Sequence, residues 1–361
     1  MALSKIRSDS LEDTAIHGNR NLIINGAMQV HQRGGTTTIN DGQSYSLDRF
    51  QGFASAGGTY TITQDSDTPS GEGFTNSLKV AVTSADSSLA SGDYYVIDQR
   101  IEGNVLAQAA FGTSGAKAVT LSFFVRSSVT GSHGGSLSNS AANRSYPYTY
   151  TVSSANTWEY KTITIPGDTA GTWLTTTGIG ARLYWGLGAG STASGPAGAW
   201  AAAEYRTAAS TVAPISTGSA TWYITGVQLE VGSEPTPFEH RSFGDELRRC
   251  QRYFWRISGY DSAGIQYPAG ANVAFSTSAA ALTVIYPVPM RGKPTFTADA
   301  NTICTGVGCY NATGQSLLST TVLAALLQIN TGASSFDPEE TNFSYFMGQN
   351  SNAFIAFDAE L

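Results

Sequence analysis

Alternating hydrophobic and polar positions recur along the first two thirds of the chain and predict β-strands. Between Ile224 and Val231, Val227 and Leu229 point to one side of the strand and Gln228 to the other, which is typical of a strand with one buried face. Gly, Ser, Asp and Asn clusters separate roughly nine such segments, a spacing that predicts a sandwich or jelly roll over residues 21–236. The predicted strands are residues 22–30, 59–66, 76–84, 94–101, 118–127, 146–152, 158–166, 181–188 and 220–231.

A change to helical spacing follows this predicted sandwich. Pro235 and Pro237 end the last strand, and Ser242 can cap a helix because Asp245 lies three residues later. Four apolar residues then recur at spacings of four, three and four, so they share one helical face. They are Phe243, Leu247, Cys250 and Phe254. The sequence predicts a linking helix over residues 237–256, whose apolar face packs either on its own sandwich or between subunits.

Strand patterns return after the helix and predict a smaller C-terminal β-domain over residues 257–361. The segment 321–330 also fits a short helix, but its neighbours favour a strand, and Pro287 and Pro289 suit a strand end. Residues 1–20 show no domain-sized pattern and are interpreted as an arm. The predicted fold class is therefore all-β, with a jelly-roll-like β-sandwich, a short linking helix and a smaller C-terminal β-domain.

Two long polar segments in the predicted sandwich are interpreted as loops, at residues 127–145 and 186–216. Binding sites often lie on such loops when a rigid scaffold holds them. Aromatic side chains there could stack on sugar rings. The aromatic candidates are Trp173, Tyr184, Trp185, Trp200, Tyr205 and Tyr310, of which Trp200, Tyr205 and Tyr310 are selected as contacts for a glycan or receptor.

Composition narrows the classes of partner. Charged residues make up 13% of the chain, about half the usual ~25%, and 41% hydrophobic residues argue against disorder. The net charge of −7 disfavours a nucleic-acid partner. No apolar run approaches the ~20 residues of a membrane span, so we expect no membrane insertion. The first residues lack the apolar core of a signal peptide, and synthesis in a cytoplasm is expected.

The motifs of common catalytic and metal sites are missing from the sequence. It contains no Walker P-loop, HExxH or GxSxG motif, and its four histidines are far apart. Asp65 and Asp67 are two residues apart, which favours a turn over an acid–base pair. Cys304 and Cys309 could form a local disulfide, but two thiols are expected in a cytoplasm. We therefore expect no enzyme activity, no cofactor and no metal.

One long motif resembles a known family. The run GVQLEVGSEPTPFEHRSFGDELRRCQRYFW at residues 226–255 resembles a module of bacteriophage tail fibre and virion appendage proteins. In that family the module follows a β-sandwich that opens with sequences like NLIINGAMQVHQRG and YSLDRF, which stand here at residues 21–34 and 45–50. The resemblance covers roughly residues 20–256. The order of the predicted strands is also similar to that of carbohydrate-binding modules of the jelly-roll type.

This resemblance implies a virion structural protein of the tail fibre type. It would be a homotrimer, joined to other virion proteins through residues 1–20, and would attach to a bacterial surface glycan or outer-membrane receptor. Many weak sites on one particle would combine into firm attachment. Two alternatives stay open: a capsid or tail decoration or adaptor protein that binds no receptor, and a glycan depolymerase.

Overall fold

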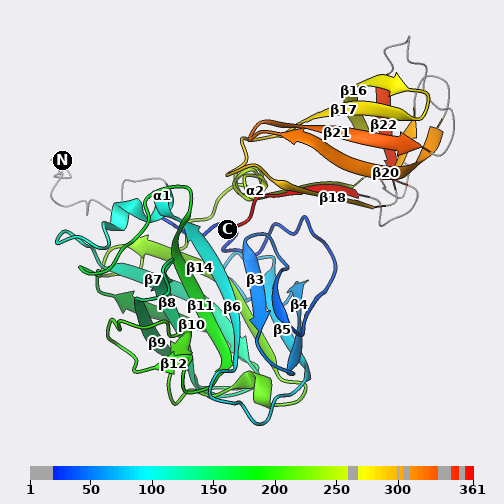
Figure 1. The fold of residues 1–361 in the computed structure, drawn as a ribbon. Coiled ribbons are helices and arrows are strands. Elements are labelled where there is room, and N and C mark those ends of the chain that lie inside the picture. The colour runs from blue at the N-terminus through cyan, green and yellow to red at the C-terminus, as the bar shows by residue number, and fades with distance from the viewer. Residues whose placement is uncertain (1–18, 259–266, 300, 305–308, 332–342, 349–353) are drawn as a thin grey trace, which may run out of the picture. The chain divides into compact units, whose positions relative to one another are not determined.

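The chain forms two compact units. The computed structural model describes residues 19–258, 267–299, 301–304, 309–331, 343–348 and 354–361 (Figure 1). The first unit comprises Met1–Glu246 together with Leu361, and the second comprises Leu247–Glu360. The expected anchor arm, residues 1–20, lies outside the described residues except for Asn19 and Arg20.

The first unit is a β-sandwich of two antiparallel six-stranded sheets, as the sequence predicts. Sheet A has the order β1-β4-β5-β14-β7-β10. Its strands are β1 (Thr37–Ile39), β4 (Thr59–Asp65), β5 (Ser77–Ser84), β7 (Val119–Ser127), β10 (Glu159–Ile165) and β14 (Thr221–Val231). Neighbours such as β5 and β14 lie far apart in sequence, which is typical of jelly-roll topology.

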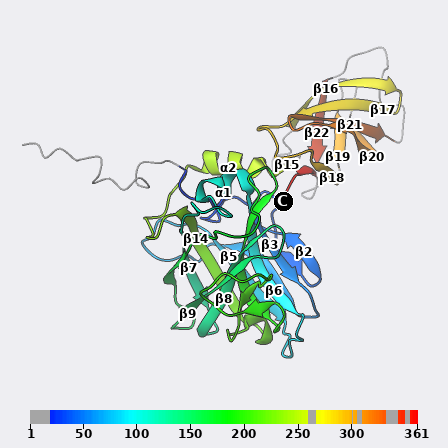
Figure 2. The ribbon, with the colours of Figure 1, turned by 60° about the vertical axis from the view of Figure 1, so that its left-hand side comes forward.

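Sheet B has the order β2-β3-β6-β11-β8-β9. Its strands are β2 (Gly42–Tyr45), β3 (Phe50–Ala54), β6 (Tyr94–Glu102), β8 (Gly131–Asn139), β9 (Ser145–Val152) and β11 (Ile179–Ala189). Short elements complete the unit: α1 (Gly103–Leu106), η3 (Ala107–Ala109), the parallel pair β12 (Ser194–Gly195) and β13 (Thr207–Ala208), and η4 (Pro214–Ser216). Figure 2 shows the strands of both sheets from a second direction.

One hydrophobic core fills the space between the two sheets. Alternate residues of each strand reach it, because successive side chains of a strand point to opposite faces. On β14 the alternation changes parity at a bulge near Gly226, whose φ is 63°. Before the bulge Ile224 is buried in the core, and after it Val227 and Leu229 are. A glycine takes this conformation at no steric cost.

The outward side of β14 is buried too, which corrects the prediction of one buried face. Gln228 and Glu230 are 0% and 1% exposed. The segment after the strand folds back over them, and the backbone N–H of Thr236 donates to Glu230 at 2.8 Å. The Gln228 side chain donates to Glu230 at 3.0 Å and accepts from the backbone N–H of Glu239 at 2.8 Å. Hydrogen bonds satisfy these buried polar groups, which would otherwise destabilise the fold.

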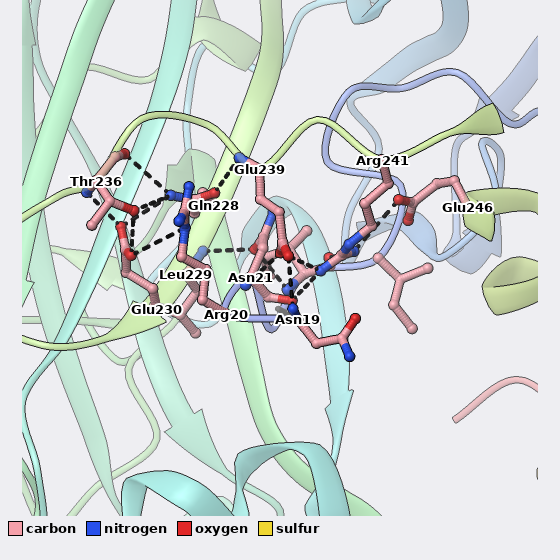
Figure 3. A network of polar contacts seen from close by, with 12 residues as sticks. Asn19, Arg20, Asn21, Gln228, Leu229, Glu230, Thr236, Glu239, Arg241 and Glu246 are labelled. Carbon is pink, nitrogen blue, oxygen red and sulfur yellow. Dashed lines mark hydrogen bonds and ion pairs between the residues drawn. The ribbon is translucent and has the colours of Figure 1, made fainter. Parts of the chain in front are cut away.

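The same segment fastens the beginning of the described chain to the end of the sandwich (Figure 3). The Glu239 carboxylate accepts the backbone N–H groups of Asn19 at 2.7 Å and Asn21 at 2.9 Å, and Arg241 donates to it at 2.9 Å. Arg241 also donates to the Asn21 carbonyl at 2.6 Å. We call Asn19, Asn21, Glu239 and Arg241 the latch. Burial raises the pKa of Glu239, but these hydrogen bonds and the Arg241 charge outweigh it, so the pKa lies below 4.5.

Two parts of the sandwich differ from the predicted pattern. Residues 22–30 form no strand, because Asn25 and Met28 have φ of 62° and 56°, and the Asn25 side chain bonds to both the N–H and the carbonyl of Val30. Local side-chain hydrogen bonds of this kind compete with a sheet ladder. Residues 127–145, expected to be a loop, contain the buried strand β8 between β9 and β11. Tertiary packing overrides the weak strand preference of its Gly and Ser residues.

The linking helix is shorter than the predicted residues 237–256. Helix α2 spans Phe243–Gln251, and β15 begins at Phe254. The Ser242 hydroxyl accepts the Asp245 backbone N–H at 3.2 Å, as the predicted cap requires. Residues 237–242 are not helical: the Glu239 N–H donates to the Gln228 side chain, and the side chains of Glu239 and Arg241 form the latch. The expected apolar stripe is divided: Phe243 is 56% exposed, Leu247 is half-buried, Cys250 is buried, and Phe254 is buried in β15 rather than in the helix.

The second unit contains a closed barrel and a three-stranded sheet. The barrel order is β16-β17-β21-β20-β19-β22, and the sheet order is β15-β23-β18. The strands are β15 (Phe254–Ser258), β16 (Tyr267–Ser276), β17 (Ala279–Ile285), β18 (Thr295–Asp299), β19 (Asn301–Cys304), β20 (Cys309–Thr320), β21 (Ala324–Thr331), β22 (Phe343–Gly348) and β23 (Phe354–Asp358). The segment 321–330 is thus mostly a strand, as its neighbours indicate. None of the helices in the described part of the chain is long and apolar enough to cross a bilayer.

The two cysteines considered for a local disulfide lie at facing strand ends of the barrel. The backbones of Cys304 and Cys309 are partners in the pairing of β19 with β20. Their side chains lie outside the described residues, so the expectation of two thiols stays a prediction.

Candidate functional site

A cavity of about 140 Å³ opens on the outer face of sheet B. Drug-sized pockets have volumes of roughly 300–1,000 Å³, so this one suits a single small polar group such as one sugar residue. Side chains from β2, β3, β6, β11 and the segment 190–213 line it. They are Gln43, Gln51, Phe53, Tyr94, Val96, Asp98, Arg100, Arg182, Tyr184, Glu204 and Arg206.

The strand period and the register build the floor of the cavity. On β6, Asp98 and Arg100 face outward, whereas Ile97 belongs to the core. Asp98 is paired with Gln51 of β3 on one side and with Tyr184 of β11 on the other. Three central strands of the sheet therefore place an amide, a carboxylate and a phenol in one row.

The segment 190–213 forms the wall by folding back over the sheet. Its Thr207 lies so close to β8 and β11 that a Cβ at Gly134 would be 2.4 Å, and at Gly186 2.5 Å, from the Thr207 hydroxyl oxygen. Only glycine fits at these two positions. The segment then brings Glu204 and Arg206 to the cavity, with their side chains paired at 3.0 Å. The loop interpreted from the sequence as a binding loop thus does line a cavity.

Asp98 is a buried acid on the cavity floor, and its pKa is raised. It is 3% exposed, accepts a hydrogen bond from the Gln51 amide at 2.8 Å and lies 3.8 Å from the Arg100 guanidinium. Burial raises its pKa to about 6, although Arg100, Gln51, Arg182 and Arg206 pull it down. Loss of hydration of the charged form outweighs the attraction of the cations.

The Gln51 side chain has one unsatisfied hydrogen-bond acceptor. It is 1% exposed, and its amide nitrogen donates to Asp98, but its amide oxygen has no hydrogen-bond donor. An unsatisfied buried acceptor costs roughly 1–3 kcal/mol. A hydroxyl group of a ligand in the cavity would supply the donor.

Aromatic rings form the apolar part of the lining. Phe53 and Tyr94 stack with their centroids 4.7 Å apart and their planes 10° apart, and the Arg206 guanidinium lies 3.9 Å from the Tyr94 centroid. Tyr184 is 5% exposed, and burial, followed by the Asp98 charge, raises its pKa. Its phenol therefore stays a neutral hydrogen-bonding group. Among the described residues, no three His, Cys, Asp or Glu side chains gather as a metal site.

A second, larger cavity of about 380 Å³ lies on the outer face of sheet A. Its lining is mainly a set of rings that pack on each other, and its charged residue, Glu72, is exposed. The rings are Phe74, Phe124, Tyr160, Phe238 and His240. Within this described lining, no buried polar side-chain atom lacks a partner. The cavity on sheet B, with Asp98 and the unsatisfied Gln51 oxygen, is therefore the better candidate for a polar ligand.

Two of the residues selected from the sequence as glycan contacts, Trp200 and Tyr205, do not line either cavity. Trp200 packs against Phe111, Tyr146 and Trp173, and its indole N–H donates to the Pro166 carbonyl at 2.8 Å. Tyr205 lies between two lining residues, but its ring covers Gly195. The backbone of Tyr310 lies in β20, and its side chain lies outside the described residues. Tyr184, from the wider set of aromatic candidates, does line the cavity on sheet B.

Replacing Trp200 with alanine tests its structural role. We expect the free energy of unfolding to fall by about 2 kcal/mol, because the half-buried ring loses three aromatic contacts and the Pro166 carbonyl loses its donor. Urea unfolding measures this loss. Glycan binding by the folded variant should be unchanged. A variant with wild-type stability and lost binding would contradict this role and restore Trp200 as a contact.

Comparisons with known proteins add structural likeness at low identity. No protein-family model matches the chain, and no curated protein sequence matches it. Among solved structures, tailspike protein 4 of bacteriophage CBA120 is 12% identical over 59% of this chain and 22% of its own, with a TM-score of 0.31. A family 11 carbohydrate-binding module from Clostridium thermocellum, bound to a mixed-linked tetrasaccharide, is 10% identical over 54% and 99%, with a TM-score of 0.29.

A xylanase 10B fragment of Clostridium thermocellum, bound to xylohexaose, is 12% identical over 50% of this chain and 26% of its own, with a TM-score of 0.25. This chain thus spans about a fifth of the tailspike and a quarter of the xylanase fragment. Similarities of this level say nothing about what the cavity binds. The ligand is therefore inferred from the side chains that line the cavity.

Proposed function

We propose that the cavity on sheet B binds one residue of a bacterial surface glycan. The observation that carries this proposal is the buried Gln51–Asp98 pair on the cavity floor, whose amide oxygen lacks a donor. A sugar hydroxyl can donate to this oxygen and accept from a neighbouring arginine at the same time. The rings of Phe53, Tyr94 and Tyr184 would contact the C–H groups of the sugar. Few polar groups among apolar walls give orientation and specificity.

We further propose that the chain is a tail-fibre-like structural protein of a bacteriophage virion. The support is the resemblance of residues 21–34, 45–50 and 226–255 to that family. A homotrimer attached through residues 1–20 would present three identical cavities. Their weak affinities would combine on the cell surface, since a second binding event on one particle is effectively intramolecular.

A decoration or adaptor protein would use the same fold without a glycan. The cavity favours the adhesin, because a sugar hydroxyl would supply the donor that the buried Gln51 oxygen lacks. A depolymerase is the third alternative, and two carboxylates, Asp98 and Glu204, do line the cavity. Both are engaged by protein cations, and Glu204 is 3.0 Å from Arg206. We propose binding without cleavage.

Replacing Tyr184 with alanine tests the proposed function. Purified protein is bound to an array of bacterial surface oligosaccharides, and affinities for the positive probes are then measured by calorimetry. We expect at least a tenfold loss with Tyr184→Ala, because an aromatic part of the cavity floor and its hydrogen-bonding phenol disappear. Tyr160→Ala, on sheet A and 47% exposed, is the matched control and should bind like the wild type.

Thermal unfolding of each variant separates lost binding from lost folding. If Tyr184→Ala is poorly folded, Arg206→Gln, which changes only the cavity wall, replaces it. Absence of binding by the wild type to every probe would reject the glycan proposal and favour decoration. New reducing ends in the wild-type mixture would instead favour a depolymerase.

A further inference from the structure

The charged side chains that line the sheet B cavity include more cations than anions. Three guanidinium groups, of Arg100, Arg182 and Arg206, meet two carboxylates, of Asp98 and Glu204, which leaves one positive charge among the lining side chains. The whole chain carries a formal net charge of −7. A positive cavity on a negative protein is a local feature that the overall composition does not produce.

Glu204 pairs unequally with two arginines of the cavity, Arg206 of the wall and Arg182 of β11. It lies 3.0 Å from Arg206 but 3.9 Å from Arg182, so it holds one guanidinium closely and the other only at the limit of an ion pair. The other guanidinium groups have main-chain partners too: Arg182 donates to the Asn139 carbonyl at 3.1 Å, and Arg100 donates to a main-chain oxygen of Leu361 and to the Gln43 side chain. Of the three, Arg182 has the longest ion pair and therefore the most capacity for a ligand carboxylate.

Arg100 also keeps one donor unused. It lies 3.8 Å from Asp98, and its buried Nε–H has no hydrogen-bond acceptor. A buried guanidinium N–H without an acceptor requires an anionic or polar oxygen from elsewhere. The unused donor and the incompletely paired Arg182 both indicate a ligand with negatively charged oxygens.

We infer that the sugar residue held in this cavity carries a carboxylate, as a hexuronic acid does. The inference rests on the proposed function and names its ligand class. A guanidinium presents its N–H groups in a planar fork that matches the two oxygens of a carboxylate. The ring and the remaining hydroxyls of the acid would still meet Tyr184 and Gln51, so the neutral and acidic parts of the ligand use different residues.

Acidification strengthens the same preference. Below about pH 6 Asp98 becomes neutral, and the excess among the lining side chains rises from one positive charge to two. A hexuronic acid stays ionised there, since ordinary carboxyl pKa values lie near 4. The groups around Asp98 are Gln51 of β3, Tyr94 and Arg100 of β6, Arg182 and Tyr184 of β11, and Glu204 and Arg206 of the segment 190–213.

The test uses pairs of oligosaccharides that differ only in this charge. The probes are bacterial capsular oligosaccharides containing glucuronic or galacturonic acid, each paired with its carboxyl-reduced neutral form. We expect the acidic member to bind at least ten times more tightly at pH 7.5, and about three to ten times more tightly again at pH 5.5. Asp98→Asn should remove this pH dependence, and Arg182→Gln should remove most of the preference.

Each outcome decides between the inference and the proposed function. Equal binding of both members overturns the inference and leaves the proposed function intact. Binding of neither member, with binding of other neutral glycans, also overturns the inference alone. Binding of sulfated or phosphorylated oligosaccharides without binding of the uronic acids overturns the carboxylate assignment. No binding of any glycan rejects both proposals. Tyr184→Ala should weaken both members equally, which separates the shared ring contacts from the charge.

Discussion

Replacing Asp98 with asparagine is expected to increase the free energy of unfolding at pH 7.5 by about 3 kcal/mol. Burial raises the Asp98 pKa from 3.8 to about 6. A pKa that is higher by one in the folded protein corresponds to ~1.4 kcal/mol, so the ionised carboxylate weakens the folded state by about 3 kcal/mol. Asparagine has nearly the same shape, can still accept from Gln51 and carries no charge. A gain in stability from this substitution would show that the buried carboxylate destabilises the folded protein at neutral pH.

The stability difference between Asp98→Asn and the wild type should depend on pH in a defined direction. The pKa of Asp98 is higher in the folded protein than in the unfolded chain. The stability from proton binding is therefore complete below about pH 4 and is lost as the pH rises through 6. The asparagine variant lacks this loss. Its advantage over the wild type should be largest above pH 7 and should shrink as the pH falls toward 4.

Urea unfolding at several pH values measures the difference. Asp65→Asn is the matched control, since burial raises the Asp65 pKa but hydrogen bonds from Asp67 and Lys79 lower it more. Asp65 is paired with Lys79 at 3.2 Å near the surface. This control should lose stability slightly, by less than about 1 kcal/mol. Equal or lower stability of Asp98→Asn at pH 7.5 would show that the cations of the cavity already compensate the buried charge.

Removing the Glu239 carboxylate should have an effect of similar size and opposite sign. Glu239→Ala is expected to lower the free energy of unfolding by about 3 kcal/mol, because the N–H groups of Asn19 and Asn21 and the Arg241 guanidinium lose their shared acceptor. Glu239→Gln should lose about half as much, since its amide oxygen can still accept from one donor. Exposed Glu234 nearby gives the control, and Glu234→Ala should change stability by less than about 0.5 kcal/mol.

This contribution also has a defined pH range. The Glu239 pKa is lowered, so the stability from its charge is present above pH 4.5 and is lost as the pH falls through the lowered value. The gap between the wild type and Glu239→Gln should therefore narrow near pH 3. Denaturant midpoints at pH 7 and pH 3 measure it. A constant gap would mean that packing rather than the carboxylate holds the latch together.

Periodicity in the sequence predicts the strands of the sandwich where propensity and burial agree. The alternation of Val119, Leu121, Phe123 and Val125 matches β7, whose four side chains all reach the core. Prediction fails where one side chain or one neighbour decides the backbone. Asn25 replaces ladder bonds with its own, and β8 is held as a strand by β9 and β11 although its sequence is rich in Gly and Ser.

The cavity can be found on two predicted strands, but only in part. In the segment 94–101, Asp98 and Arg100 occupy the positions that alternate with the core residues, and Arg182 and Tyr184 do so in 181–188. Charged residues at outward positions of central strands are a recognisable signal. The approach of Glu204 and Arg206 depends on how a long segment folds back, which local spacing does not determine. Residue type and position in that segment favour Trp200 as a contact, but its neighbours in space make it a packing residue.

The latch joins residues that are made far apart in time. Its bonds from Asn19 and Asn21 to Glu239 span 220 and 218 positions, and the Leu22 N–H donates to the Leu229 carbonyl at 2.8 Å. A ribosome adds about 5–20 residues per second, so Glu239 follows Asn21 by roughly 10–45 s. Strand β14, which lies between β5 and β7, is also among the last parts of the sandwich to be made. The sandwich can therefore complete its folding only late in translation, and the edges of β5 and β7 that pair with β14 stay open until then.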